Sequence, residues 1–219
     1  PPKSYLYGIP YELYKKYKIR RYGFHGTSHL YVSQRAAALL NKEVKDIKII
    51  TAHLGNGCSM AAVKYGQSID TTMGFTPLEG LLMGTRSGDL DPSLILYIMG
   101  KEGLTLGEAN TLLNKHSGLI GISGESSDMR EILAAVKDNQ QRSKWAFEIF
   151  CYKIKKYIGA YTAAMGGLDA LVFTGGIGEN STEVREEVCK EMEFLGIELD
   201  KIKNQNNDEI ISKVHSKVS

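Results

Sequence analysis

The sequence predicts an α/β layered fold built on a mixed sheet. Three strand-like segments joined by short turns follow one another between residues 46 and 72, which is the pattern of an antiparallel meander. Several helix-patterned segments come next, and a strand–glycine loop–helix unit lies further along the chain. Strands followed by helices and then by one more strand favour helices packed in layers on a single sheet.

The region before the meander is expected to hold two helices. Pro10–Tyr17 is predicted as a short helix with a stripe of tyrosines for packing. The glycine-containing segment Arg20–His29 (RRYGFHGTSH) is predicted as a tight turn. Thr27 or Ser28 is expected to cap a helix that runs through VSQRAAALLNKE.

The meander follows directly. Asp46–His53 is a β-branched run and predicts a buried strand. Gly55-Asn56-Gly57 is predicted as a tight hairpin turn, because Asn-Gly tolerates positive φ at both central positions. Cys58–Lys64 is the second expected strand and, after a turn at Tyr65-Gly66, Gln67–Thr72 is the third.

The middle of the chain predicts four helices. The first, PSLILYIMGKEG, has Pro92 in its first turn, where the missing N–H costs nothing. The second, LTLGEANTLLNKHSG, is closed by Gly118, and the third, SSDMREILAAVKD, is expected to be capped by Ser126 or Ser127. Ser143–Met165 carries apolar residues at helical spacing and predicts a long amphipathic helix.

The last part of the chain predicts a strand–loop–helix unit. Ala170–Thr174 is an expected short buried strand. Gly175-Gly176-Ile177-Gly178 then leads into a helix capped near Asn180 or Ser181, with Glu183 completing a capping box. The tail KIKNQNNDEIISKVHSKVS is expected to be loose, with a weak strand or none.

Composition and charge argue against several classes of function. The chain is 42% hydrophobic and 24% charged, as in globular proteins, and its net charge of +2 gives no reason to expect nucleic acid or an anionic membrane as partner. No apolar run is long enough to span a bilayer, and no signal core begins the chain. The three cysteines (Cys58, Cys151, Cys189) form no metal or disulfide pattern, so a cytoplasmic location is expected.

Asp70–Pro92 (DTTMGFTPLEGLLMGTRSGDLDP) is the most informative segment. It is rich in glycine, threonine and acidic residues and contains a single cation, Arg86. Such a composition is expected where a chain lies close to a charged ligand, with the arginine placed to meet an anion. The alternative is that Arg86 is a structural brace, paired with Asp89 or Asp91.

Two further glycine-rich turns are candidate phosphate-binding loops. In His53–Ser59 (HLGNGCS), glycines allow backbone N–H groups to approach an anion, although a plain hairpin explains the same pattern. Thr174–Asn180 (TGGIGEN) lies between a strand and a helix, where a helix dipole favours an anion, although an ordinary turn is equally compatible. The chain has neither the dinucleotide fingerprint, nor a P-loop, nor the protein-kinase motifs.

One histidine is singled out by its neighbours. His25 is flanked by glycines, which expose its ring, and it follows Arg20 and Arg21. A functional role is therefore favoured over a purely structural one. Three other histidines show no metal-ligand spacing and are expected to be structural or on the surface: His29, His116 and His215.

Together, RRYGFHGTSH, AHLGNGCS, DTTMGFTPLEGLLMGTRSGDLDP and FTGGIGENS closely resemble the acetate kinase family in type and order. The resemblance runs from the start of the chain to the helix after Gly178 and is poorer in the tail. It implies a ribonuclease H-like lobe of the superfamily of acetate and sugar kinases, actin and chaperone ATPases, whose members hold the nucleotide between two lobes. The predicted meander fits the start of such a lobe.

The resemblance also implies a reaction and its residues. His25 and Arg86 match the family's transition-state stabilisers for direct, reversible phosphoryl transfer from ATP to acetate, giving acetyl phosphate. Mg²⁺ and a homodimer are implied as well. The residues implied to bind ATP or ADP are His53, Leu54, Gly55, Asn56 and Gly57 in the phosphate hairpin, Asp128, Met129 and Arg130 at the nucleoside, and Gly176, Ile177, Gly178, Glu179 and Asn180 on the adenosine side.

The chain departs from the family by lacking several of its functional groups. The family's catalytic aspartate, substrate-binding arginine and ATP-site asparagine, and a metal-linked glutamate, have no counterpart here, so no metal ligand is assigned. The expectation is a C-terminal, nucleotide-binding lobe, with residues 1–45 as an interdomain or hinge segment and 46–219 as the truncated lobe. Alone, it should bind nucleotide weakly and turn over little.

Two alternatives stay open. Propionate and butyrate kinases share these motifs. A non-catalytic nucleotide-binding or dimerisation lobe is also compatible, with the helix Ser143–Met165 as its interface.

Overall fold

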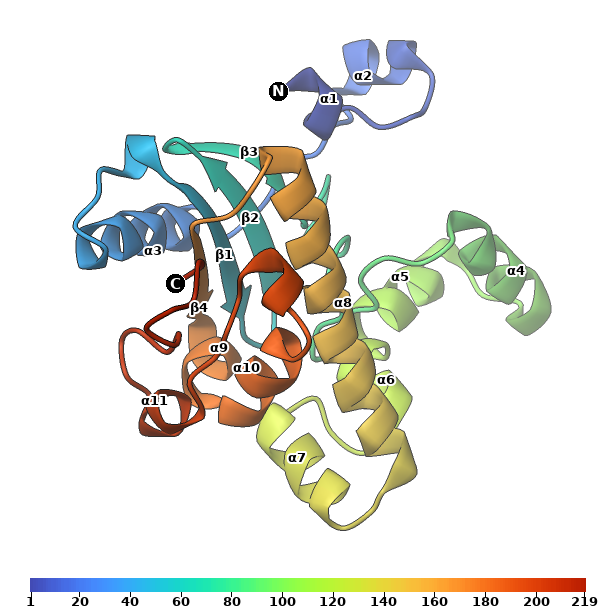
Figure 1. Cartoon of the computed structure of the whole chain (residues 1–219). Coiled ribbons are helices and arrows are strands. Elements are labelled where there is room, and N and C mark those ends of the chain that lie inside the picture. The colour runs from blue at the N-terminus through green and yellow to red at the C-terminus, as the bar shows by residue number, and fades with distance from the viewer.

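A four-stranded mixed sheet forms the centre of the computed structural model, which describes all residues from 1 to 219. β1 (Lys48–Leu54), β2 (Cys58–Lys64) and β3 (Gln67–Thr71) pair antiparallel, and β4 (Ala170–Thr174) joins β1 in parallel, so the strand order is β3-β2-β1-β4. Figure 1 shows helices on both sides of this sheet. The predicted mixed α/β fold with its three-strand meander is confirmed.

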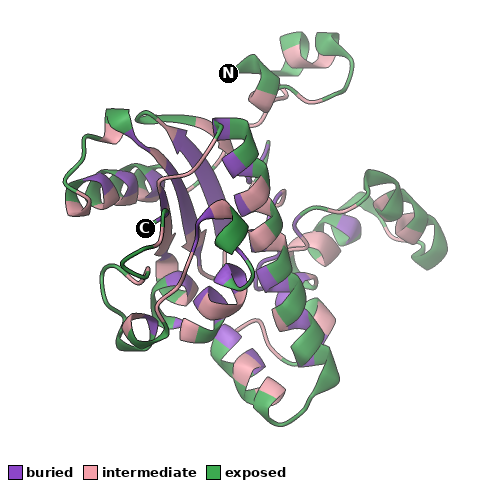
Figure 2. Ribbon diagram, viewed as in Figure 1, coloured by how far each residue is buried: buried purple, intermediate pink, exposed green.

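Each face of the sheet packs on a different helix, since neighbouring side chains of a strand point to opposite faces. Ile50, Ala52 and Leu54 of β1 belong to the main apolar core, which also contains the buried residues of the long helix α8 (Gln141–Met165). Ile49 belongs to a smaller core on the opposite side, with Ala37 from α3 (Gly26–Leu39). The buried positions follow the strands and the inner side of α8 (Figure 2).

Of the N-terminal helices, α3 packs on the sheet, whereas α1 (Pro2–Tyr5) touches it only at β3. α1 and α2 (Tyr11–Tyr17) bury no residue, and their tyrosine rings pack on one another (Figure 1). The predicted cap of α3 is wrong, because the helix starts at Gly26 with His25 as N-cap in the left-handed conformation, φ 59°, and without a side-chain cap bond. The Ser28 hydroxyl instead bonds to His53. A short 3₁₀ helix, η1 (Val44–Asp46), precedes β1.

The helices of the middle region follow the prediction with three differences. They are α4 (Pro92–Glu102), α5 (Leu106–Lys115), α6 (Gly118–Ser123), α7 (Met129–Lys137) and α8. Gly118 does not close the second of them, which ends at Lys115 with His116 as its C-cap, and Gly118 instead begins the next helix. The helix α6 was not expected. The cap of α7 is Asp128 rather than Ser126 or Ser127, because the Asp128 carboxylate accepts from the N–H of Arg130 while the Ser126 hydroxyl accepts from the N–H of Asp128.

The glycine-rich segment after β4 is itself a helix. α9 (Gly175–Asn180) is followed by α10 (Thr182–Cys189), which Ser181 caps by accepting from the N–H of Val184. Ser181 was one of the two expected caps. The expected capping box is wrong, because Glu183 is the second residue of α10 and its carboxylate accepts from the Thr182 hydroxyl.

The tail is more ordered than predicted. It contains α11 (Lys201–Asn206), and Val218 is buried. A short 3₁₀ helix, η2 (Glu193–Leu195), precedes it. The last carbonyl, that of Ser219, accepts from the N–H of Leu171, so the end of the chain covers the outer edge of β4. The sequence pattern did not reveal this because the contacts join residues far apart in the chain. None of the helices is both long and apolar enough to cross a membrane.

Candidate active site

Three segments of the chain meet around an open cleft of about 760 Å³. They are the β1–β2 loop, the start of α7 and the helix α9, which supply the three groups of predicted nucleotide-binding residues. The cleft lies where the parallel strands β1 and β4 end, the usual ligand position in open α/β sheets. Its lining includes Gly55, Asn56, Asp128, Met129, Arg130, Gly176, Ile177 and Asn180. The other predicted residues lie beside the cleft and do not line it: His53, Leu54, Gly57, Gly178 and Glu179.

The β1–β2 loop has a different geometry from the predicted hairpin turn. Leu54 pairs with Cys58, so three residues form the loop, and none of Gly55, Asn56 and Gly57 has φ in the left-handed region. The N–H of Gly84 donates to the carbonyl of Asn56 at 3.0 Å, so the loop is held from outside rather than by its own turn type.

Gly84 allows the chain to pass close to this loop. A Cβ at Gly84 would lie 2.0 Å from Oδ1 of Asn56 and 3.2 Å from the carbonyl oxygen of Ser127. A larger residue there would displace the Asn56 side chain, which lines the cleft. Sequence reasoning did not assign this role, because the neighbour of Gly84 belongs to a distant segment.

The start of α9 packs directly on the end of β1. Gly175 has φ +77°, and a Cβ there would lie 2.7 Å from the carbonyl oxygen of Leu54, so glycine meets both a conformational and a steric requirement. The Thr174 hydroxyl and the Gly175 N–H both donate to the Glu179 carboxylate. Glu179 is therefore turned back toward the start of its own helix, which explains why it does not line the cleft.

Arg185 of α10 is a residue that sequence reasoning missed. Its side chain is buried and donates to the carbonyls of Gly178 and Glu179 at the end of α9. It also donates to Asn204 and Asn207 in and just after α11. One arginine in a helix with three glutamates shows no distinguishing pattern, so only the tertiary structure reveals that Arg185 joins α9 to the tail.

Arg130 forms an ion pair at the rim of the cleft. Its guanidinium donates to both carboxylate oxygens of Asp128, and these hydrogen bonds lower the pKa of Asp128 to about 2. Both residues line the cleft, and Asp128 also caps α7. In this arrangement Arg130 bonds to its neighbour rather than pointing freely at a ligand.

His25 and Arg86 converge on one point above the β1–β2 loop. A Cβ at Gly57 would lie 3.5 Å from Nη1 of Arg86 and 3.8 Å from Cε1 of His25. The guanidinium donates to the carbonyl of Pro77 at 3.2 Å and forms no ion pair with any acid. Arg86 therefore does not form the alternative structural ion pair with Asp89 or Asp91. Some of its N–H groups stay available to bind an anion.

A chain of hydrogen bonds joins His25 to the interior. The ring of His25 stacks on that of His53 at 4.1 Å between centroids. Nδ1 of His25 and Nε2 of His29 each lie 2.8 Å from the Ser59 hydroxyl. Nδ1 of His29 lies 2.7 Å from the Thr51 hydroxyl. His29 is buried, as expected for a structural histidine.

The environment keeps these histidines neutral near pH 7. Burial lowers the pKa of His25, and the nearby His53 and Arg86 lower it further. Burial also lowers the pKa of His53, against the opposing effect of Glu179. Arg86 is therefore the positive group at the point where it meets His25.

The buried His29 should make the chain less stable in acid. Burial lowers its pKa from 6.5 to about 4, so the unfolded state binds a proton more readily between these values. Unfolding free energy should fall by about 3 kcal/mol as pH drops from 6.5 to 4, with no further contribution from His29 below that. Urea denaturation followed by the fluorescence of Trp145 measures this.

The variant His29→Gln isolates this contribution. It lacks the titrating ring, so the difference in stability between it and the parent should shrink as pH falls through the same window. A difference that stays constant from pH 7 to pH 4 contradicts the prediction.

No metal-binding cluster is found in the chain. Three or more His, Cys, Asp or Glu side chains do not gather anywhere in the structure in a way that could hold an ion.

A sequence model of the Acetokinase family matches residues 1–219. The acetate kinase of Thermotoga maritima is 59% identical over all of this chain and 55% of its own length. The crystal structure of Porphyromonas gingivalis acetate kinase gives a TM-score of 0.96 at 50% identity, covering 100% of this chain and 55% of that chain. That of a propionate kinase from Francisella tularensis gives 0.94 at 46% identity, covering 99% and 56%. The chain spans about half the length of the curated relatives it matches.

Proposed function

The chain belongs to the acetokinase family, and from this premise we propose that it is the nucleotide-binding lobe of an enzyme that transfers a phosphoryl group between ATP and acetate. Its fold is that of the superfamily of acetate and sugar kinases, actin and chaperone ATPases. The observation that carries the proposal is that the three predicted nucleotide segments line one cleft, beside the point where Arg86 and His25 meet.

The cleft suits a nucleoside diphosphate or triphosphate. Its volume of about 760 Å³ is in the range of small-molecule sites, and apolar side chains such as Met129 and Ile177 alternate with polar ones such as Asn56 and Asn180. The phosphates would then lie toward the β1–β2 loop, next to Arg86 and His25.

The proposed reaction is direct in-line transfer. The bond between the γ-phosphorus and the oxygen that bridges it to ADP breaks, while an acetate oxygen forms the new bond to that phosphorus. Negative charge spreads over the equatorial oxygens in this transition state. The Arg86 guanidinium donates to those oxygens as a charged group, and the His25 imidazole adds a neutral N–H.

One assignment of hydrogens along the hydrogen-bond chain gives His25 the tautomer that this role needs. With Thr51 donating to Nδ1 of His29, Nε2 of His29 carries the hydrogen and donates to Ser59. Ser59 then donates to Nδ1 of His25, which leaves the proton of His25 on Nε2. A ring in this tautomer faces Gly57 as a donor.

Other features of the whole protein are proposals of the same kind. We propose residues 1–45 as the interdomain segment, with α3 packed on the sheet, and residues 46–219 as the lobe. Magnesium would be held by the nucleotide phosphates and by residues outside this chain. A homodimer through α8 is supported by its exposed Trp145 and Tyr152, and a cytoplasmic location by three buried, free cysteines.

The test is a turnover assay of the full-length protein that carries this chain. With ATP, Mg²⁺ and acetate it should give acetyl phosphate, trapped as the hydroxamate, whereas the chain alone should give little or none. Propionate and butyrate in parallel test the second candidate, a propionate or butyrate kinase, which the likeness to the propionate kinase structure favours. Binding of ATP without transfer to any of the three acids would instead indicate a non-catalytic lobe.

A further inference from the structure

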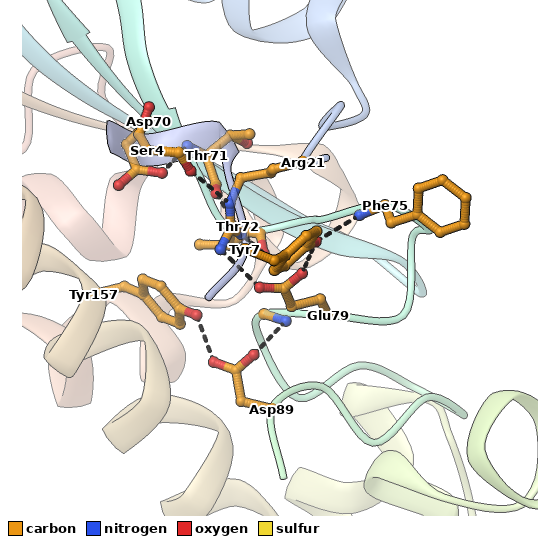
Figure 3. Close-up of polar contacts among 11 residues, drawn as sticks. Ser4, Tyr7, Arg21, Asp70, Thr71, Thr72, Phe75, Glu79, Asp89 and Tyr157 are labelled. Atoms are coloured by element: carbon orange, nitrogen blue, oxygen red, sulfur yellow. Dashed lines mark hydrogen bonds and ion pairs between the residues drawn. The ribbon is translucent and has the colours of Figure 1, made fainter. Parts of the chain in front are cut away.

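A polar cluster outside the cleft surrounds Glu79. Figure 3 shows its carboxylate between Arg21 and Tyr7, which come from the N-terminal segment. Nη2 of Arg21 donates to Oε1 of Glu79 at 2.7 Å, and the Tyr7 hydroxyl donates to Oε2. The side chains of Arg21 and Glu79 are only 21% and 31% exposed, so this ion pair is shielded from water.

The same arginine anchors the end of β3. Its Nη1 donates to the carbonyls of Thr71 and Thr72, both at 3.0 Å, and its Nε donates to the carbonyl of Ser4. All guanidinium nitrogens therefore have partners. Arg21 joins the N-terminal segment, the end of the meander and Glu79 in one rigid contact.

Glu79 closes a tight turn formed by residues 74–79. A Cβ at Gly74 would lie 1.6 Å from Oε2 of Glu79 and 2.2 Å from the Tyr7 hydroxyl, so the carboxylate lies directly against the backbone of Gly74. The Tyr7 hydroxyl also accepts from the N–H of Phe75 at 2.8 Å. Pro77 is part of this turn, and its carbonyl accepts from Nη1 of Arg86.

The segment 80–89, which carries Arg86, is held at its two ends by contacts that do not involve Glu79. Asp89 accepts from the N–H of Gly80 at 2.8 Å, and its own N–H donates to the carbonyl of Gly80 at 2.9 Å. The Tyr157 hydroxyl of α8 donates to the same carboxylate (Figure 3). The backbone of residues 80–89 is therefore pinned at its base. The Arg86 guanidinium has two contacts of its own, in which Nη1 donates to the carbonyl of Pro77 in the turn and to Sδ of Met83.

We propose that Glu79, held by Arg21 and Tyr7, is a positioning residue that orients the Arg86 guanidinium through the carbonyl of Pro77. The inference rests on the proposed function, in which Arg86 meets the transferred phosphoryl group. It gives the N-terminal segment a part in catalysis although it lies away from the cleft. The contacts of Tyr7 and Arg21 with Glu79 fix the conformation of the 74–79 turn. The carbonyl of Pro77 in this turn then fixes the orientation of the Arg86 guanidinium.

The test is a double-mutant cycle in the full-length protein. Glu79→Ala should lower kcat roughly 10-fold or more with KM for ATP within about twofold, because a misplaced catalytic group costs rate rather than binding. In the Arg86→Ala background the same substitution should cause no further loss. Glu79→Gln keeps one acceptor oxygen and should recover part of the rate.

A matched control removes an acid from an exposed pair. Glu186 binds Lys201 at 2.7 Å away from the cleft, and Glu186→Ala should leave kcat unchanged. An unchanged kcat in Glu79→Ala, or an equal loss with and without Arg86, would overturn the inference and leave the proposed function standing.

A second readout does not depend on turnover. Phenylglyoxal modifies accessible guanidinium groups, and mass spectrometry measures the rate at Arg86. The rate should rise several-fold in Glu79→Ala and stay at the parent value in Glu186→Ala. If the parent protein proves inactive, the proposed function fails, and this rate still decides the inference: an unchanged rate at Arg86 overturns it.

Discussion

Replacing Arg86 with Ala should lower kcat of the full-length protein by about 10²–10³-fold while KM for ATP changes little. The guanidinium has no carboxylate partner and reaches the same point above Gly57 as His25, so the structure gives it no competing ion pair. Its loss removes a charged donor that acts mainly in the transition state. Steady-state rates with ATP and acetate measure the effect.

Arg86→Lys should recover little of the rate, because an ammonium group cannot reproduce the planar fork of donors. Arg142 provides the matched control: it also donates to main-chain carbonyls, those of Gly121 and Ile122, but does not line the cleft. Arg142→Ala should leave kcat unchanged. A rate for Arg86→Ala close to that of the parent would exclude the catalytic role of Arg86.

Replacing Arg185 with Met should cause the largest loss of stability, about 3–5 kcal/mol. The substitution keeps a side chain of similar length but removes every hydrogen bond of the guanidinium, so the buried carbonyl of Gly178 and the partly buried carbonyl of Glu179 lose their donor. The melting temperature should fall by roughly 10 °C for a chain of this size. Affinity for ATP should fall as well, because α9 lines the cleft.

Thermal unfolding and ATP titration measure the two effects of Arg185→Met. Lys201→Met is the control, since Lys201 lies nearby on α11 but forms only an exposed ion pair with Glu186, which contributes little. Its stability should stay within about 0.5 kcal/mol of the parent. If Arg185→Met were as stable as Lys201→Met, the link between α9 and the tail would not matter energetically.

Much of the fold could be predicted because its signals are local. The β-branched runs of β1 and β2, the proline in the first turn of α4 and the helical spacing in α8 each depend on neighbouring residues. The caps were harder to predict. Ser28 and Ser126 are suitable caps by type, but their hydroxyls bond elsewhere, to His53 and to the N–H of Asp128.

The candidate site was predictable as a set of motifs but not as a geometry. The glycine-rich loops and Arg86 can be recognised in the sequence. The resemblance to acetate kinases assigned them to one site and gave each of them a role. The sequence could not reveal that Gly84 touches Asn56, because the two residues belong to distant segments. It could not reveal that Arg185 donates to the end of α9, because a single arginine in a glutamate-rich helix has no distinguishing pattern.

The sequence by itself determined the α/β class, the order of the four strands and of the longer helices, and the family of this chain, because each depends on local periodicity or on contiguous motifs. Only the tertiary structure decided which side chains meet. It placed Arg86 and His25 at one point above Gly57, turned Glu179 away from the cleft, and closed the 74–79 turn with Glu79. These outcomes depend on packing between distant segments, where close-packed side chains and backbone leave room for one arrangement of hydrogen-bond partners.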